Sequence, residues 1–143
     1  MNVTRSVFPF HVAVPVNDLH AALDFYQQHF AVEIGRRSDQ WIDLNLYGHQ
    51  FVLHLDPEHQ PKQHINSVDG KQVPVPHYGV ILPMTEWRDL ADKLTQKKVD
   101  FVIEPYIRFA GQAGEQGTLF LLDPSGNALE FKGFNDFSQI FAS

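Results

Sequence analysis

Residues 119–131 read LFLLDPSGNALEF, which places two apolar runs on either side of a polar stretch. The proline, serine, glycine and asparagine at positions 124–127 are typical of turns. The apolar runs have the length of strands, so the segment predicts two adjacent strands joined by a turn. Glu130 lies within the second run. Burial of its carboxylate there would be costly without partners, although strand alternation also allows it a solvated face.

The stretch before this segment predicts a helix flanked by further strands. An apolar stripe marks residues 85–98 as a helix, with Thr85 as its N-cap, acidic residues near its start and lysines at its end. Strand-like patterns cover residues 77–83, 100–104, 118–122 and 128–131. The second half of the chain is therefore predicted to run strand, helix, strand, strand, strand.

The first half repeats this order. Asp18 is the expected N-cap of a helix over residues 19–30. Strand-like patterns cover residues 8–16, 32–36, 40–47 and 50–55. Two such βαβββ units predict an α+β domain in which the paired units form a curved mixed sheet around a shared cleft, with the helices outside.

We expect a single domain over residues 1–143. The segment between the two halves is polar, contains four prolines and Asp69–Gly70, and shows no helical stripe, so it reads as a linker. The expected parts are unit one at about 8–56, the linker at about 57–76, unit two at about 77–134 and a C-terminal tail over 135–143.

Composition excludes several classes of protein. The chain of 143 residues has no cysteine, which excludes a disulfide scaffold, a thiolate nucleophile and a thiolate metal site. Its net charge of -6 argues against a nucleic-acid-binding surface. We find neither a signal peptide nor an apolar run long enough to span a bilayer, and therefore expect a soluble, cytoplasmic protein without a membrane partner.

Four ligand-type residues occupy repeat-equivalent places. His11 and His77 stand early in the first strands of the two halves, while His54 and Glu130 lie in the fourth strands. A single histidine in a strand is more often a core or surface residue than a ligand. Approximate twofold symmetry between the halves would bring all four side chains together, which favours a site. The other histidines are expected at the surface: His20, His29, His49, His59 and His64.

The chain resembles the vicinal oxygen chelate superfamily, which includes glyoxalase I, extradiol dioxygenases, fosfomycin-resistance enzymes and bleomycin-binding proteins. The resemblance covers nearly the whole chain and is carried by residues 10–14 (FHVAV), 22–26 (ALDFY) and 119–131. More narrowly, residues 48–50 (GHQ), 73–77 (VPVPH) and 109–116 (FAGQAGEQ) are similar to a bacterial group of predicted extradiol-type dioxygenases.

The resemblance implies one divalent metal bound by His11, His77 and Glu130. Two histidines and one carboxylate hold Fe(II) in extradiol enzymes, so Fe(II) is the favoured metal, with Mn(II), Ni(II) and Zn(II) as alternatives. Glyoxalase-type relatives take a fourth ligand, typically a carboxylate or amide, from the last strand of the first unit. His54 stands in that place here, either as a fourth ligand or as a catalytic acid/base beside a three-ligand metal. A homodimer is also implied.

The leading hypothesis is an extradiol-like dioxygenase acting on a small aromatic or vicinal-diol substrate. A glyoxalase-like lyase or isomerase, or a thiol-adding resistance enzyme, is the alternative, and a non-catalytic drug-binding protein is a third reading. The segment 109–117 reads either as a mobile lid or as an ordinary long hairpin. Candidate substrate contacts, each with a core or solvated alternative, are Trp41, Tyr47, Tyr106, Arg108 and Phe109.

Overall fold

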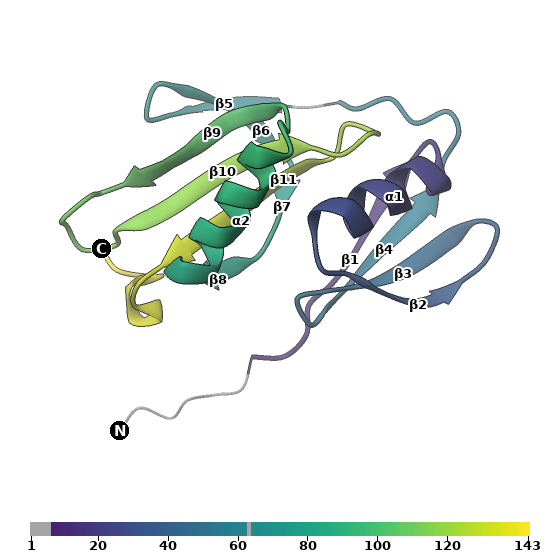
Figure 1. Cartoon of the computed structure of the whole chain (residues 1–143). Coiled ribbons are helices and arrows are strands. Elements are labelled where there is room, and N and C mark those ends of the chain that lie inside the picture. The colour runs from purple at the N-terminus through teal and green to yellow at the C-terminus, as the bar shows by residue number, and fades with distance from the viewer. Residues whose placement is uncertain (1–6, 63) are drawn as a thin grey trace. The chain divides into compact units, whose positions relative to one another are not determined.

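The computed structural model of the chain describes residues 7–62 and 64–143. The chain forms two units, unit 1 (Met1–His59) and unit 2 (Gln60–Ser143). Each unit combines one α-helix with a sheet of mixed parallel and antiparallel strands (Figure 1). The expected α+β architecture with few helices is confirmed.

In unit 1, strand β1 is parallel to β4, and the remaining strand pairs are antiparallel, in the order β1-β4-β3-β2. Asp18 caps α1 as expected, since its carboxylate accepts a hydrogen bond from the amide of Ala21 at 2.9 Å. Tyr26 of α1 packs its ring against Phe51 of β4, with 5.4 Å between ring centroids. The elements are β1 (His11–Val16), α1 (Leu19–His29), β2 (Glu33–Arg37), β3 (Trp41–Leu46) and β4 (His49–Leu55).

In unit 2, the principal sheet has the order β7-β11-β10-β9, and β8 also pairs with β11. Both β7 and β8 run parallel to β11, whereas β10 is antiparallel to its neighbours. The elements are β7 (His77–Tyr78), β8 (Ile81–Pro83), α2 (Met84–Gln96), β9 (Phe101–Arg108), β10 (Gln116–Leu122), β11 (Ala128–Phe134) and a short 3-10 helix η1 (Phe137–Gln139).

The N-terminus of α2 differs from expectation. Pro83 is the N-cap residue, and the helix has no side-chain cap. The helix begins at Met84, directly after β8, so Thr85 already lies within its first turn and cannot serve as the cap. The prediction of Thr85 as N-cap was therefore wrong.

The segment read as a linker contains a β-hairpin. Strands β5 (His64–Val68) and β6 (Lys71–Val75) pair antiparallel around Asp69 and Gly70. Both turn residues have positive φ, 53° and 73°, the conformation that Asp-Gly favours in a tight hairpin. Composition concealed these strands, because the side chains of β5 are mostly exposed and β6 contains a proline. The hairpin belongs to unit 2.

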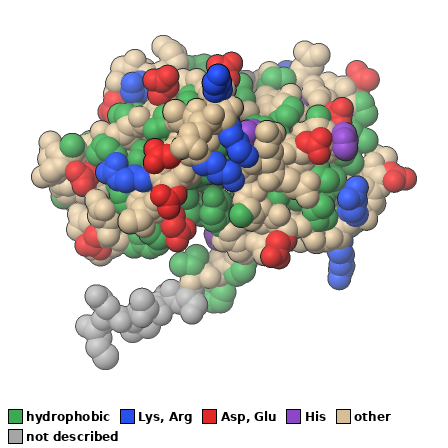
Figure 2. Space-filling view, viewed as in Figure 1, with side chains coloured by type: hydrophobic (Ala, Val, Ile, Leu, Met, Phe, Trp, Pro, Cys, Tyr) green, Lys and Arg blue, Asp and Glu red, His purple; other side chains and the backbone are tan. Residues whose placement is uncertain are grey.

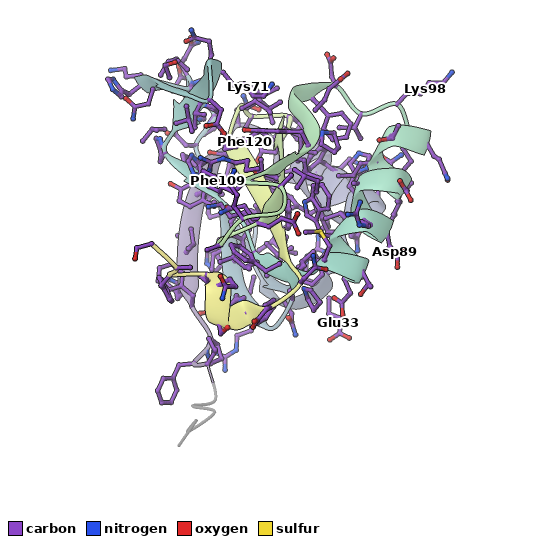
Figure 3. All side chains as sticks on the ribbon, turned by 90° about the vertical axis from the view of Figure 1, so that its left-hand side faces the viewer. Glu33, Lys71, Asp89, Lys98, Phe109 and Phe120 are labelled. Atoms are coloured by element: carbon purple, nitrogen blue, oxygen red, sulfur yellow. The ribbon has the colours of Figure 1, made fainter. Side chains whose placement is uncertain are left out.

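The hairpin and α2 cover opposite faces of the unit 2 sheet. Val73 of β6 packs in a buried cluster with Ile103 and Phe120. Adjacent residues of β10 and β11 project from the opposite face of the sheet, which α2 covers. There Trp87 of α2 donates a 2.9 Å hydrogen bond to the carbonyl of Phe131. Figure 3 shows Lys71 and Phe120 on the hairpin side and Asp89 on the outer side of α2.

One of the five histidines expected at the surface is buried. His29 ends α1 with 9% of its surface exposed and packs its ring against Phe25 at 4.8 Å. It continues the buried stripe of the helix, in which Tyr26 lies three residues earlier. The other four are exposed or half-buried, as expected.

The face drawn in Figure 2 carries basic side chains interspersed with acidic ones. Within the described residues, neither α-helix has the length and apolarity needed to cross a membrane.

Candidate metal centre

The centre of the candidate site is a contact between His77 and Glu130. The Nε2 atom of His77 lies 3.0 Å from Oε2 of Glu130. Strand pairing produces this contact, because β7 runs parallel to β11 with His77 beside Ala128. Glu130 is two residues further along β11 and therefore projects from the same face as Ala128. Glu130 keeps 11% of its side chain exposed and His77 keeps 30%.

Each of the two side chains has a second partner that fixes its orientation. The Nδ1 atom of His77 lies 2.7 Å from the carbonyl oxygen of Pro74. Because a carbonyl only accepts, Nδ1 must carry a proton, and Nε2 is the nitrogen directed at the carboxylate. Thr118 donates its hydroxyl to Oε1 of Glu130 at 2.8 Å. A ligating histidine typically has its second nitrogen fixed in this way.

Electrostatics in the metal-free protein favour a charged pair. The hydrogen bond to Glu130 is the main cause that raises the pKa of His77 above its usual value, and it outweighs the opposing effect of burial. For Glu130 burial is the largest influence and would raise the pKa. The hydrogen bonds from His77 and Thr118, together with the charge of Lys132, outweigh burial and leave the pKa of Glu130 lowered. The carboxylate of Glu130 is therefore held in its ionised form.

A small open pocket adjoins the pair. It has a volume of about 220 Å³. Its lining residues are His77, Gly79, Val80, Ile81, Glu130 and Lys132. Gly79 is required where β7 gives way to β8, since a Cβ atom there would collide with the carbonyl oxygen of Glu130. Lys132 also approaches the carboxylate, with Nζ 4.0 Å from Oε1 of Glu130.

In unit 1, the neighbour of His11 is Gln50. The register of β1 against β4 pairs His11 with Gln50, and Nδ1 of His11 lies 2.7 Å from Oε1 of Gln50. Gln50 in turn approaches Oδ2 of Asp43 with its amide nitrogen at 3.4 Å. Sequence reasoning missed Gln50, although an amide on this strand is a ligand type that the resemblance itself implies.

His54 lies four residues further along β4. It is exposed, and its strand partners are Pro15 in β1 and Trp41 in β3. His54 and Trp41, two residues assigned to the site from the sequence, are therefore neighbours in unit 1. Tyr47 stands apart from them in the turn between β3 and β4, with a φ of 51°.

Tyr106 and Arg108 both bind Asp69 at the tip of the β5–β6 hairpin. The Arg108 Nε atom lies 2.6 Å from Oδ2 of Asp69, and the Tyr106 hydroxyl donates to the same oxygen at 3.0 Å. The hydrogen bond from Arg108 is the main cause that holds the pKa of Asp69 below its usual value, and the one from Tyr106 adds to it. The carboxylate of the chain itself thus takes the place expected for an anionic substrate on Arg108.

Phe109 begins the loop that was read either as a lid or as a hairpin. It has a φ of 53°, and the Arg108 guanidinium lies 4.8 Å from its ring centroid. The loop joins β9 to β10, which pair as an antiparallel hairpin. The amide of Gly114 donates to the side chain of Gln139 near the C-terminus at 3.2 Å. The segment 109–117 therefore contains the loop of the long hairpin that β9 and β10 form.

The four predicted ligands divide between the units. His11 and His54 belong to unit 1, and His77 and Glu130 belong to unit 2. Within the described part of either unit, no group of three or more His, Asp or Glu side chains is gathered for a metal ion. The pair of His77 and Glu130 nevertheless brings one imidazole nitrogen and one carboxylate oxygen within 3.0 Å of each other, a donor set that fits Fe(II), Mn(II) or Zn(II).

Comparison with known proteins agrees with the fold. The family model for the glyoxalase/bleomycin resistance protein/dioxygenase superfamily matches residues 9–131. A glyoxalase/bleomycin resistance protein/dioxygenase from Alicyclobacillus acidocaldarius is 30% identical, with a TM-score of 0.78 over 94% of this chain and 96% of that one. No curated protein sequence matches the chain significantly.

Two more distant structures share the fold. The fosfomycin resistance protein FosX from Listeria monocytogenes is 12% identical, with a TM-score of 0.66 over 94% of this chain and 98% of that one. Lactoylglutathione lyase from Agrobacterium tumefaciens is 15% identical, with a TM-score of 0.66 over 98% of this chain and 99% of that one. With most of its length matched by the family model, the chain belongs to the glyoxalase/bleomycin resistance protein/dioxygenase superfamily.

Proposed function

We propose that the chain is a metal-dependent enzyme in which His77 and Glu130 hold one divalent metal together with His11. His11 would come from the same chain or from a second copy in a homodimer. The observation that carries the proposal is the contact of 3.0 Å between His77 and Glu130, in which each side chain is also fixed by a further hydrogen bond. Superfamily membership supports a metal site at these positions.

The surroundings of the pair suit a metal site. The carbonyl of Pro74 holds the ring of His77, so that Nε2 is available as a ligand once its proton is lost. The hydroxyl of Thr118 holds the carboxylate of Glu130 from the other side. Little side-chain entropy would therefore be lost when the two groups bind a cation.

The reaction that we propose first is extradiol-like cleavage of a small aromatic or vicinal-diol substrate by dioxygen. Two histidines and a carboxylate are the ligands of non-haem Fe(II) oxygenases, and the bound metal would supply open positions for neighbouring substrate oxygens. His54, exposed beside Trp41, is the residue we assign to acid/base catalysis. Trp41, Tyr47 and Phe109 are the aromatic side chains that we assign to contact with an aromatic ring, and Tyr47 and Phe109 are 37% and 45% exposed.

A glyoxalase-like lyase or isomerase, or a thiol-adding resistance enzyme, is the second candidate. The observation that favours it is Gln50 beside His11, because an amide on this strand is a fourth ligand of the glyoxalase type. Such chemistry does not require iron, since Mn(II), Ni(II) or Zn(II) can stabilise negative charge on substrate oxygens. A protein that binds a drug-like ligand without catalysis is the third candidate.

The test is metal analysis of anaerobically purified protein combined with oxygen uptake on a panel of catechols. We expect about one iron per site in the wild-type protein and oxygen consumption with at least one catechol. His77→Ala should lose the metal, whereas the matched control His64→Ala, at an exposed position of the hairpin in the same unit, should keep it.

The other outcomes separate the candidates. Nickel, zinc or manganese without oxygen uptake would favour the isomerase or addition chemistry. No bound metal in the wild-type protein would favour the drug-binding candidate. Full metal content in His77→Ala would overturn the site itself.

A further inference from the structure

Lys132 lies on the same face of β11 as Glu130, two residues further along the strand. It lines the pocket that also contains His77 and Glu130. One third of its side chain, 33%, remains exposed. A flexible cation thus stands at the edge of the proposed metal centre, in distant contact with Glu130.

The backbone beneath Lys132 is fixed on both sides. Its strand partners are Thr118 in β10 and Ile81 in β8, and its amide donates to the carbonyl of Val80 at 3.2 Å. The residue therefore sits in the interior of the sheet, and the position from which its side chain extends is well defined. Only the four-carbon stem and its ammonium group are left to move.

Glu130 makes limited use of this ammonium group. The distance of 4.0 Å from Nζ to Oε1 is the outer limit of an ion pair. The same oxygen already accepts a hydrogen bond from Thr118 at 2.8 Å, and Oε2 faces His77 at 3.0 Å. An ion pair at this distance with a partly exposed lysine contributes little to stability. Lys132 can therefore turn to a second anion at low cost.

The net charge of the pocket indicates what kind of second anion Lys132 would bind. Among its lining residues, the carboxylate of Glu130 and the ammonium of Lys132 cancel, and His77 must be neutral when it acts as a ligand. A divalent metal would leave the pocket with about two uncompensated positive charges, by the formal charge of the ion. Arg108, the other candidate for an anionic substrate, is already neutralised by Asp69 at 2.6 Å.

We propose that Lys132 selects substrates that carry a carboxylate or similar oxyanion besides the two oxygens that chelate the metal. This inference rests on the proposed function and narrows its substrate to an anionic chelator. Lys132 would bind the oxyanion directly with its ammonium group, so it determines specificity for a particular class of ligand. A lysine that merely supports Glu130 would influence the binding of the metal and of all ligands alike.

The experiment measures ligand affinity by calorimetry on protein loaded with Zn(II), which binds chelators without oxidising them. The probes are 2,3-dihydroxybenzoate and 3,4-dihydroxybenzoate, each compared with catechol. We expect the wild-type protein to bind at least one of the two acids about tenfold more tightly than catechol, as for a hydrogen bond to a charged group. Lys132→Met should remove this preference and Lys132→Arg should keep it. Lys93→Met, an exposed lysine on α2, is the matched control and should behave as wild type.

Results with either protein can overturn the inference alone. For the wild type, such a result is equal binding of the acids and catechol by the zinc-loaded protein. For Lys132→Met, it is either a preference that is kept or a parallel loss of the metal and all three ligands. A wild-type protein that fails to bind zinc overturns the proposed function, and this inference with it, so the two failures are distinguishable.

Discussion

His77 is held between two groups of its own unit. Its Nε2 atom lies 3.0 Å from the carboxylate of Glu130, and its Nδ1 atom lies 2.7 Å from the carbonyl of Pro74. The two partners come from β11 and from β6, which are separated in sequence by more than fifty residues. The orientation of the imidazole therefore depends on both the sheet and the hairpin that precedes it.

The first prediction concerns the pH dependence of stability in the metal-free protein. Because the pKa of His77 is raised in the folded protein, His77 contributes fully to the free energy of unfolding below its ordinary pKa of 6.5. This contribution is lost as the pH rises through the raised pKa. Because the pKa of Glu130 is lowered in the folded protein, Glu130 contributes to the free energy of unfolding above its ordinary pKa of 4.5. This contribution is lost as the pH falls through the lowered pKa. The pair should therefore stabilise the protein most between these two ordinary values.

Urea unfolding of metal-free wild-type protein and Glu130→Gln checks this. We expect Glu130→Gln to lower the free energy of unfolding on the order of 1 kcal/mol at pH 5.5, with a smaller difference at pH 9. Asp24→Asn is the control, because it removes the acid of an exposed His20–Asp24 pair on α1 and should change little. The assignment of a charged pair would be contradicted if wild type and Glu130→Gln differed more in free energy of unfolding at pH 9 than at pH 5.5.

The second prediction separates Gln50 from His54. Because Gln50 contacts His11 at 2.7 Å, Gln50→Leu should disturb that ligand and weaken metal binding by about tenfold or more. His54 is paired with Pro15 and Trp41 instead, so His54→Leu should keep its metal and lose turnover. Competition with a coloured chelator measures the affinity. Loss of metal in His54→Leu, with full affinity in Gln50→Leu, would reverse the two roles.

Much of the fold and the pair in unit 2 could be predicted from the sequence. The apolar periodicity of residues 119–131 predicts β10 and β11, and the repeat of strand and helix predicts the α+β architecture. Glu130 was expected to need partners if buried, and His77 and Thr118 supply them. These features follow from local pattern, which is visible in one sequence.

What could not be predicted depends on pairing between distant segments. The register of β1 on β4 sets Gln50 beside His11, and a shift of a few residues would have placed His54 there. The β5–β6 hairpin was missed because the side chains of β5 are mostly exposed and β6 contains a proline, while the residues that anchor the hairpin, Tyr106 and Arg108, lie far along the chain. Arg108 looked like a partner for substrate because its own partner, Asp69, is remote in sequence.

The third prediction concerns this hairpin. Asp69→Asn removes the charge shared by Arg108 and Tyr106 but keeps a residue that tolerates the positive φ of 53°. We expect the amides of β5 and β6 to exchange hydrogen several times faster, while the rest of unit 2 keeps its protection.

Hydrogen–deuterium exchange read by mass spectrometry makes the measurement. Asp89→Asn is the matched control, since Asp89 points outward from α2 (Figure 3). Unchanged exchange in Asp69→Asn would mean that the packing of Val73 against Ile103 and Phe120 holds the hairpin without the charge.

The fourth prediction concerns Gly79, which lies between β7 and β8 directly against the backbone of Glu130. In Gly79→Ala the new methyl group would overlap the carbonyl oxygen of Glu130 in β11. Because β11 is paired with β10 on its other side, it cannot easily move aside. We expect a loss of stability of about 1–3 kcal/mol, as for overpacking in a protein core. Because the displaced residue is itself a proposed ligand, metal affinity should fall with stability.

Urea unfolding and a zinc titration on the same preparation check both effects. Gly35→Ala is the matched control, because its Cβ would meet Asp43 at an ordinary contact distance of 3.4 Å in an exposed strand. A Gly79→Ala protein as stable as Gly35→Ala would show that β7 and β8 can withdraw from β11. If that protein also kept its metal, the close approach at Gly79 would not be what positions Glu130.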